Sequence, residues 1–318
     1  MNSGKVAVLD IGSNTIKLFI AYRNSEKKII PCFERSISCR ISSGLIKHND
    51  FFLSSESIAK IIHSISLFIP IIEEQEAKKL IAVGTEALRK AKNANLIVEE
   101  IKRRYGFRLR VLSGEEEAEC IAIGISTDPR LQKVSSFHAF DLGGGSVELI
   151  QIAKEKVLSA KSLSIGAVVM TEKFFSDQRY PIKPAEVIKA RNYITCMLED
   201  HIEKSKCEKL IACGGTVIHL RHLLRPVIQS GNEAKDEIIF NEIQLLLNEF
   251  ISHKLEKIKN KYPEIPDDRI DIFPAALLVI DQIMKFYNSQ SIIHSFHNLR
   301  YGIATKPSFM RNSIHSFK

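Results

Sequence analysis

The chain has 318 residues, of which 45% are apolar, so it can bury one large or two medium-sized cores without staples. It has no run of the roughly 18 to 20 apolar residues that a membrane helix needs, and its six cysteines form no C-x-x-C pair, which argues against a zinc cage or a disulfide frame. Lys and Arg outnumber Asp and Glu by 45 to 37, which favours anionic partners, but the chain has no tryptophan and no groove-reading motif. We therefore expect a cytoplasmic protein with reduced core cysteines, no membrane segment and no nucleic-acid partner.

The N-terminal segment predicts a β-hairpin that closes on a glycine turn. An apolar strand ends at Asp10, the turn Gly12-Ser13-Asn14 follows, and a second strand returns over Ile16 to Ala21. The backbone N–H groups of such a turn can cradle a phosphate, or the glycine can simply permit a tight corner. An unpaired carboxylate at the end of a buried strand is costly, so we expect Asp10 either to bind Mg²⁺ or to accept N–H groups of its own loop.

The segments that follow predict a strand, two helices and another strand. A third strand is expected over Lys28 to Phe33, and helical apolar spacing covers Leu53 to Ile72 and Ala94 to Tyr105. Between these helices Lys79 to Thr85 is typical of a buried parallel strand. Arg89 follows it, either as a guanidinium clamp on phosphate or as a surface arginine on a helix.

A capping box opens the next predicted helix. Ser113 follows the strand expected over Arg108 to Leu112, and Glu116 stands three residues further on, at the spacing of the motif. The helix runs through Gly124, and all three glutamates at 115–117 suit the positive end of its dipole. These residues alone do not single out a catalytic glutamate.

The chain repeats itself at an offset of about half its length. The segment 8–18 aligns without gaps on 139–149, an offset of 131 residues, and Lys79 to Thr85 aligns on the strand that starts at Lys209 at an offset of 130. We infer a duplicated unit, each copy a mixed sheet with helices on its faces, and we expect the two glycine turns to face one cleft. The boundary is expected near Glu117 to Thr127, giving domains 1–124, with 303–318 packed on it, and 125–302.

The second half carries the matching turn, Gly143-Gly144-Gly145-Ser146, after Asp141. A third and weaker cradle is predicted at Gly214-Gly215-Thr216, after the strand from Lys209. Strands are expected over Val147 to Ile152 and Lys156 to Leu163, and helices over Pro184 to Cys207 and Asn241 to Tyr262, the latter with a lysine-rich outer face. The histidine pairs His219/His222 and His294/His297 lack the third ligand that a transition-metal site needs.

Taken together, these segments resemble the exopolyphosphatase / guanosine pentaphosphate phosphohydrolase (Ppx/GppA) family. The matching segments are Asp-Ile-Gly-Ser-Asn-Thr at 10–15, Gly-Thr-x-Ala-x-Arg-x-Ala-x-Asn at 84–93, Ser-Gly-x-Glu-Glu-Ala at 113–118, Asp-Leu-Gly-Gly-Gly-Ser-x-Glu at 141–148, Gly-Gly-Thr at 214–216, and the runs 164–167, 268–271 and 295–302. The resemblance covers essentially the whole chain in order. It is to the short two-domain form, which lacks a C-terminal HD-type extension.

The resemblance implies a duplicated actin-like α/β fold (ASKHA, ribonuclease H-like) with the active site in the cleft between the domains. By position, Glu117 matches the family's catalytic glutamate and Glu148 its second essential carboxylate, while Asp10 and Asp141 are expected to bind the metal. The expected phosphate contacts are Gly12, Ser13, Asn14, Arg89, Gly143, Gly144, Gly145, Ser146, Gly214, Gly215, Thr216 and Arg269.

The implied reaction is Mg²⁺-dependent hydrolysis of a terminal phosphoanhydride, with Glu117 activating water for in-line attack. The substrate would be inorganic polyphosphate or a guanosine pentaphosphate or tetraphosphate, the latter linking the protein to the stringent response, and related proteins suggest a homodimer. Two other interpretations stay open. One is a regulator that binds polyphosphate or alarmone with little turnover, and the other is an actin-like kinase or filament protein.

Overall fold

The structure is a computed structural model that describes residues 4–42, 51–131, 134–154, 156–175, 181–225 and 237–306. Its contacts divide the chain into a first unit, residues 1–133 with 297–318, and a second unit, residues 134–296. The divisions at 124/125 and 302/303 expected from the sequence therefore differ from the observed ones. The reason is that helix α12 (Leu299–Thr305) packs along helix α4 (Gly114–Ser126), so both helices stay whole within the first unit. Of the segment expected to join this domain, residues 307–318 lie outside the described residues.

The first unit is built on a five-stranded mixed sheet with the strand order β3-β2-β1-β4-β5. Its strands are β1 (Val6–Ile11), β2 (Thr15–Arg23), β3 (Ile29–Ser38), β4 (Lys79–Gly84) and β5 (Leu109–Val111). The pairs β1–β2 and β2–β3 are antiparallel, as the glycine hairpin predicts, whereas β1–β4 and β4–β5 are parallel. Every residue of β1 is buried, because helices cover both faces of the sheet.

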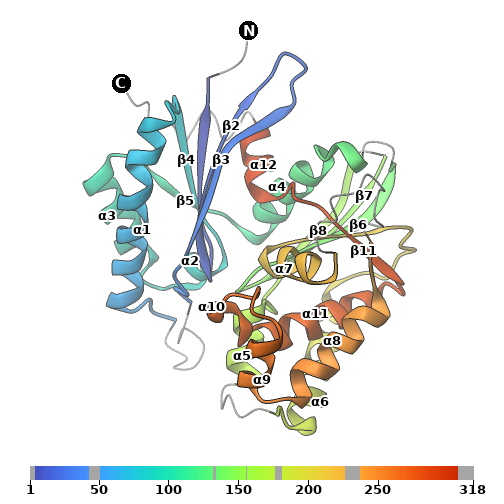
Figure 1. The fold of residues 1–318 in the computed structure, drawn as a ribbon. Coiled ribbons are helices and arrows are strands. Elements are labelled where there is room, and N and C mark those ends of the chain that lie inside the picture. The colour runs from blue at the N-terminus through green and yellow to red at the C-terminus, as the bar shows by residue number, and fades with distance from the viewer. Residues whose placement is uncertain are drawn as a thin grey trace. The chain divides into compact units, whose positions relative to one another are not determined.

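Helices on the two faces of this sheet come from distant parts of the chain. Figure 1 shows α1 (Ser55–Glu74) and α3 (Ala94–Tyr105) on one face, and α4 with the C-terminal α12 on the other. Alternate residues of β1 face the core beneath α1 and α3, among them Leu9 and Ile11. Asp10 therefore points to the opposite face, where α4 and α12 lie. The short α2 (Glu86–Lys90) follows β4.

Two glycines let α4 and α12 touch backbone to backbone. A Cβ atom added at Gly124 would lie 2.1 Å from the Asn298 carbonyl oxygen, and one at Gly302 would lie 1.7 Å from the Cys120 carbonyl oxygen. No side chain fits at either position. This close approach sets the α12 residues, Arg300 among them, against the sheet.

The second unit repeats the arrangement of the first. Its sheet has the order β10-β11-β9-β6-β7-β8, in which β8-β7-β6-β9-β11 corresponds to β3-β2-β1-β4-β5. Again the first three strands in the chain form antiparallel pairs and the next pairs parallel to the first. This shared order confirms the predicted duplication. The strands are β6 (Ser136–Leu142), β7 (Val147–Ala153), β8 (Lys156–Leu163), β9 (Leu210–Cys213), β10 (Glu237–Ile239) and β11 (Ser291–His294).

The helices of the second unit surround the almost fully buried α11. They are α5 (Ala167–Phe174), α6 (Pro184–His201), α7 (Gly215–Leu224), α8 (Phe240–Ser252), α9 (Leu255–Lys261), α10 (Asp267–Ile270) and α11 (Phe273–Phe286). Twelve of the 14 residues of α11 are buried, so it is the centre of this unit's core.

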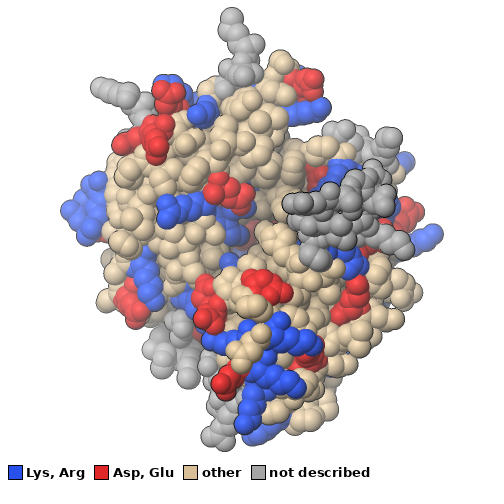
Figure 2. All heavy atoms as spheres, viewed as in Figure 1, with Lys and Arg blue, Asp and Glu red and all other residues tan. Residues whose placement is uncertain are grey.

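Figure 2 shows basic side chains gathered around α9, where Lys254, Lys257 and Lys261 are exposed.

Two predicted helices are shorter than the sequence pattern suggested. α6 ends at His201 and not near Cys207, because residues 203–206 offer no apolar side chain to bury. The helix expected over Asn241 to Tyr262 breaks after Ser252 into α8 and α9. The break folds Tyr262 back onto α8, where its hydroxyl donates to Glu249 at 2.6 Å.

By length and composition alone, the 20-residue α1 would suffice to cross a membrane, with a mean hydropathy of 1.4 over its most apolar window. Its inner face, including Ile61, Ile65 and Phe68, belongs to the core of the first unit, which is also how a core helix of a globular domain lies. The six cysteines are free thiols, as expected. Cys32 and Cys196 are exposed, however, so the expectation that all six are core residues is wrong for these two, whose strand and helix turn them outward.

Candidate functional site

The predicted site residues form two groups, one in each unit, and each group lies at the carboxyl ends of the central parallel strands. The group of the first unit follows β1 and β4, and that of the second unit follows β6 and β9. Ligands of α/β sheets bind at such strand ends, where loops and helix N-termini converge. The first group comprises Asp10, Gly12, Ser13, Asn14, Arg89 and Glu117, and the second comprises Asp141, Gly143, Gly144, Gly145, Ser146, Glu148, Gly214, Gly215, Thr216 and Arg269.

Asp10 is a buried carboxylate that two cations flank. Its residue is 6% exposed, and burial raises the pKa of its carboxyl, while the charges of Lys17 and Arg300 oppose that rise. Lys17 stands opposite Asp10 in the β1–β2 register, and Arg300 comes from α12. These two cations were not anticipated as neighbours of Asp10, although the hairpin register predicts the one at Lys17.

The first glycine turn combines a tight corner with the buried side-chain amide of Asn14. Gly12 N–H donates to the Thr15 carbonyl at 3.1 Å, and the Asn14 carbonyl accepts from the backbone N–H groups of Cys39 and Arg40. The Asn14 side chain is buried, yet among the residues that the structure describes neither its Nδ2 nor its Oδ1 has a hydrogen-bond partner. A buried amide without partners is costly, so this position suits a polar ligand. Ser13, also buried, belongs to the same turn.

The structure distinguishes the three glutamates that begin α4. The predicted capping box is present, since Ser113 Oγ accepts from the Glu116 N–H and the Glu116 side chain accepts from the Ser113 N–H. Glu115 and Glu116 reach solvent, whereas Glu117 is buried at 6% exposure. Only Glu117 of the three thus has the dry environment that suits a general base.

Arg89 binds Glu117 and a second buried carboxylate. Its Nη1 donates to Glu117 Oε2 and to the Leu112 carbonyl, both at 2.9 Å, and its Nη2 donates to Glu86 Oε2 at 2.5 Å. Burial lowers the pKa of Arg89, but the two carboxylates outweigh it and raise the pKa overall. Sequence reasoning missed Glu86, although its i, i+3 spacing to Arg89 on a short helix was a usable signal.

The second glycine turn turns its carbonyls toward α5. The carbonyls of Gly143, Gly144 and Gly145 accept from backbone N–H groups at the start of α5. In a trans peptide the following N–H points opposite to the carbonyl, so the N–H groups of residues 144–146 point away from α5. Three successive N–H groups on one side make an anion-binding concavity. The Ser164–Gly166 segment supports the turn, because a Cβ at Gly166 would lie 2.5 Å from the Gly145 carbonyl carbon.

Glu148 is held by two hydroxyls. Ser146 Oγ and Ser162 Oγ donate to its Oε1 at 2.6 and 2.7 Å, and the residue is 2% exposed. The serine on β8 was not predicted from the sequence, because only the β7–β8 register places it opposite Glu148.

The third glycine segment brings Asp141 and Arg269 together. Gly214 has a φ of 107°, and a Cβ there would lie 2.9 Å from Asp141 Oδ1. A Cβ at Gly215 would lie 2.7 Å from Arg269 Nη1. The segment begins α7, whose N-terminal turn includes the buried Thr216. The two glycines thus make room for a carboxylate on one side and a guanidinium on the other.

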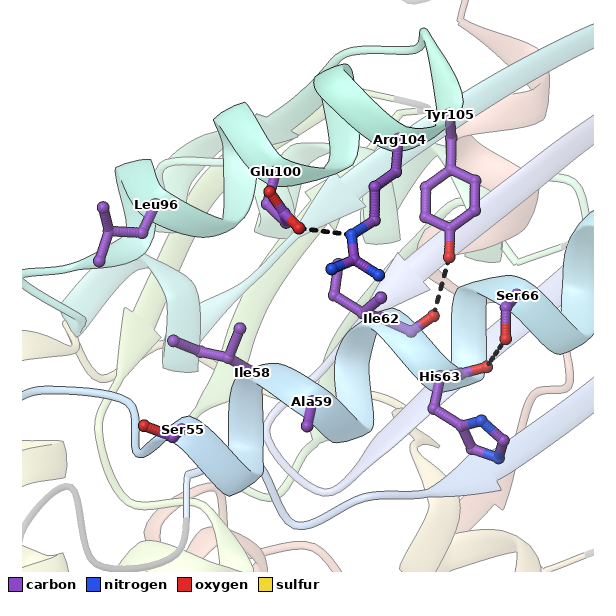
Figure 3. Close-up of a pocket in the computed structure, with 10 residues that line it drawn as sticks. All are labelled: Ser55, Ile58, Ala59, Ile62, His63, Ser66, Leu96, Glu100, Arg104 and Tyr105. Carbon is purple, nitrogen blue, oxygen red and sulfur yellow. Dashed lines mark hydrogen bonds and ion pairs between the residues drawn. The ribbon is translucent and has the colours of Figure 1, made fainter.

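A separate groove of about 680 Å³ lies between α1 and α3 (Figure 3). Its walls include Ile58, Leu96 and the pair Glu100–Arg104, and the Tyr105 hydroxyl donates to the Ile62 carbonyl across it at 3.1 Å. None of the predicted site residues lines this groove. We assign the site by its chemistry and not by the size of this hollow.

The described residues contain no cluster of three or more His, Cys, Asp or Glu side chains that could hold a metal ion by itself. The predicted metal residues Asp10 and Asp141 lie in different units. A lone carboxylate is compatible with the expected Mg²⁺, which binds through one or two carboxylates, water and substrate phosphates. The histidine pairs therefore carry no metal assignment.

The sequence matches the Ppx/GppA phosphatase family over residues 20–307. The chain therefore belongs to the Ppx/GppA phosphatase family. Among its relatives, a guanosine-5'-triphosphate,3'-diphosphate pyrophosphatase from Photobacterium profundum is 26% identical over 306 residues, covering 93% of this chain and 58% of that protein. A putative exopolyphosphatase from Haemophilus influenzae is 23% identical over 307 residues, covering 95% of this chain and 91% of that protein.

Solved structures of the family share the fold. The Aquifex aeolicus Ppx/GppA family member superposes with a TM-score of 0.79 at 24% identity, covering 98% of this chain and 99% of that one. An exopolyphosphatase from Cytophaga hutchinsonii superposes with a TM-score of 0.80 at 22% identity, covering 94% and 96%. The expected duplicated actin-like α/β fold is thus confirmed. The chain spans 58% of the length of the Photobacterium profundum pyrophosphatase and 59% of the length of a second such pyrophosphatase, from Vibrio vulnificus.

Proposed function

We propose that this chain hydrolyses the terminal phosphoanhydride of inorganic polyphosphate, of guanosine pentaphosphate, or of both. The observation that carries the proposal is a pair of buried glutamates, Glu117 and Glu148, one in each unit and each held by polar partners. Family membership supports the same chemistry. The two substrates come from the names of two relatives, a guanosine-5'-triphosphate,3'-diphosphate pyrophosphatase that is 26% identical and a putative exopolyphosphatase that is 23% identical.

In the proposed reaction Glu117 accepts a proton from the attacking water. Arg89 fixes its Oε2 at 2.9 Å, and the buried position keeps bulk water from competing for the carboxylate. Positioned general bases of this kind typically contribute about 10²- to 10⁴-fold to the rate. Because the transferred group develops little covalent character, positioning and charge supply most of the catalysis.

The glycine turns bind the phosphates in this proposal. The N–H groups of residues 144–146 face away from α5 and offer fixed dipoles to an anion, and Asn14 offers an unpartnered amide. Arg269 lies against Gly215, and Asp141 lies against the adjacent Gly214. Arg269 therefore adds a positive charge near Asp141.

Asp10 and Asp141 are the residues that would hold Mg²⁺, and we propose that the ion is required. Burial raises the pKa of Asp10, which indicates that a cation bound there would relieve an electrostatic cost. When bound, Mg²⁺ neutralises charge on the phosphate oxygens. From the resemblance to the Ppx/GppA family we further propose that the protein is a cytoplasmic homodimer.

The test is phosphate release from long polyphosphate, tripolyphosphate and guanosine pentaphosphate, measured side by side with and without Mg²⁺. The proposal predicts release from at least one substrate, which chelation of the metal abolishes. Tight binding by calorimetry without any release would instead identify a regulator that binds alarmone or polyphosphate. Transfer of phosphate from ATP to an acceptor would identify a kinase.

A further inference from the structure

Glu86 is a buried carboxylate that the proposed reaction does not use. Its residue is 5% exposed, at the start of the five-residue helix α2 directly after β4. A buried carboxylate is costly unless it is paired, so its retention here requires partners or a role. The chain supplies two partners one turn further along the same helix.

Arg89 and Lys90, two cations of α2, bind Glu86. Arg89 Nη2 donates to Oε2 at 2.5 Å, and Lys90 Nζ lies 3.0 Å from Oε1. Each oxygen of Glu86 is therefore engaged by a different cation. The side chain of Glu86 is 7% exposed, that of Arg89 21% and that of Lys90 35%. The carboxylate is thus buried, and its two cations lie between it and the solvent.

Arg89 connects this pair to Glu117. Its Nη1 bridges Glu117 Oε2 and the Leu112 carbonyl, at the end of β5 where the chain enters α4. With Nη1 engaged by Glu117 and Nη2 by Glu86, the two ends of one planar guanidinium are tied to two carboxylates. Because the guanidinium is planar and rigid, a shift of one carboxylate displaces Arg89 and with it the other carboxylate.

We propose that Glu86 is a positioning residue, which holds Arg89 so that Arg89 fixes the carboxylate of Glu117. The inference rests on the proposed function, since it takes Glu117 as the base. It assigns Arg89 to Glu117 and not to a phosphate, in contrast to the clamp expected from the sequence. It also explains why a charged pair is buried at this point: the pairing sets a geometry on which proton transfer depends.

Removal of the Glu86 charge should therefore lower kcat and leave KM unchanged. In Glu86→Gln the guanidinium loses the carboxylate charge that binds its Nη2. We expect kcat to fall about 10- to 100-fold, the usual effect of misplacing a reacting group, with KM within about twofold. Arg89→Lys should produce the same loss, because lysine lacks the fork. The double variant should be little worse than either single one, since both break one connection.

Two further variants separate this role from a general effect on folding. Glu86→Asp keeps the charge and should recover part of the lost kcat. Glu100→Gln removes another glutamate with two arginine partners, Arg103 and Arg104, on the outer face of α3, and should change neither kcat nor KM. Thermal unfolding of each variant establishes that the fold is retained.

The experiment distinguishes the failure of this inference from the failure of the proposed function. If the wild-type protein releases phosphate and Glu86→Gln keeps full kcat, or if Arg89→Lys raises KM with kcat unchanged, the positioning role is wrong and Arg89 is a phosphate clamp. If the wild-type protein releases no phosphate, the proposed function fails. NMR then still decides the inference: the Arg89 side-chain ¹⁵N–¹H signals should show hindered guanidinium rotation that Glu86→Gln abolishes, and free rotation in the wild type contradicts it.

Discussion

The guanidinium of Arg269 lies against the Cα atom of Gly215, so close that a Cβ there would be 2.7 Å from Nη1. Gly215 begins α7, and Arg269 belongs to α10, more than fifty residues later in the chain. Because Gly215 has no side chain, the guanidinium of Arg269 can lie beside the N-terminus of α7 and near Asp141. A motif glycine here has a steric role in addition to any backbone contact with phosphate.

Replacing Gly215 by alanine should displace Arg269 without unfolding the protein. The clash is with the far end of a flexible side chain, which can move, and we expect the loss of one charged phosphate contact, about 1.5 to 3 kcal/mol. KM for the phosphate substrate should therefore rise by about tenfold or more. Steady-state kinetics measure this, with Gly4→Ala as control, where the added Cβ meets only the Lys78 side chain. An unchanged KM would show that Arg269 does not contact the substrate.

Replacing Ser162 by alanine should weaken the support of Glu148. One of two hydroxyl donors to Oε1 is lost, that at 2.7 Å, while Ser146 keeps the other. We expect kcat to fall about tenfold, in line with the loss of one hydrogen bond to a charged group. The control is Ser159→Ala, three residues earlier on β8. Equal activity of the two variants would mean that Ser146 alone suffices to orient the carboxylate.

Replacing Gly302 by alanine should destabilise the first unit. The new methyl group would lie 1.7 Å from the Cys120 carbonyl oxygen, which backbone hydrogen bonding within α4 prevents from moving freely. Overpacking typically costs about 1 to 3 kcal/mol and at backbone contacts more, so Tm should fall by several degrees. Differential scanning calorimetry gives the comparison with the wild type. A Tm equal to that of the wild type would mean that α12 can slide away from α4.

The pH dependence of stability should show a contribution from His219. Burial, with the nearby Arg269 charge, lowers the pKa of His219 from 6.5 to about 4. The unfolded chain binds the proton more readily than the folded one, so this contribution to stability is complete above about pH 6.5 and is lost as the pH falls toward 4. Because the side chain is partly exposed, we expect only about 1 kcal/mol between pH 7 and pH 5.

Urea unfolding at the two pH values measures this effect. The variant His219→Gln should lose less stability than the wild type over the same interval, and His201→Gln, which alters an exposed histidine, should behave like the wild type. A steeper loss in His219→Gln would contradict the assignment. His138 and His297 have pKa values lowered by burial as well, so part of the acid sensitivity should remain in every variant.

Local sequence patterns predicted much of the fold because each pattern is compatible with one kind of local structure. The Asp-x-Gly turns at 10–12 and 141–143 predicted both hairpins, and the offset repeat predicted two sheets with one strand order. The failures came where tertiary contacts decide. Tyr262 returns to Glu249 and breaks one predicted helix into two, and Gly302 against Cys120 keeps α12 within the first unit.

The sequence predicted the motifs of the site but not the side chains that bind the motif residues. The capping box is visible in the sequence, but the choice of Glu117 over its two neighbours depends on burial, which only the packing of α4 reveals. Glu86 binds Arg89 from the same helix, and Ser162 binds Glu148 from the neighbouring strand. Their residue types are too common to signal such a role by themselves.

Phosphate release by Glu117→Gln and Glu148→Gln tests the proposed reaction most directly. Each change keeps the size of the side chain, removes its charge and replaces one acceptor oxygen by an NH₂ donor. The proposed reaction predicts that both variants bind polyphosphate or guanosine pentaphosphate, keep the wild-type Tm within a few degrees, and lose at least about 10²-fold in kcat. Turnover at the wild-type rate in both variants would contradict it.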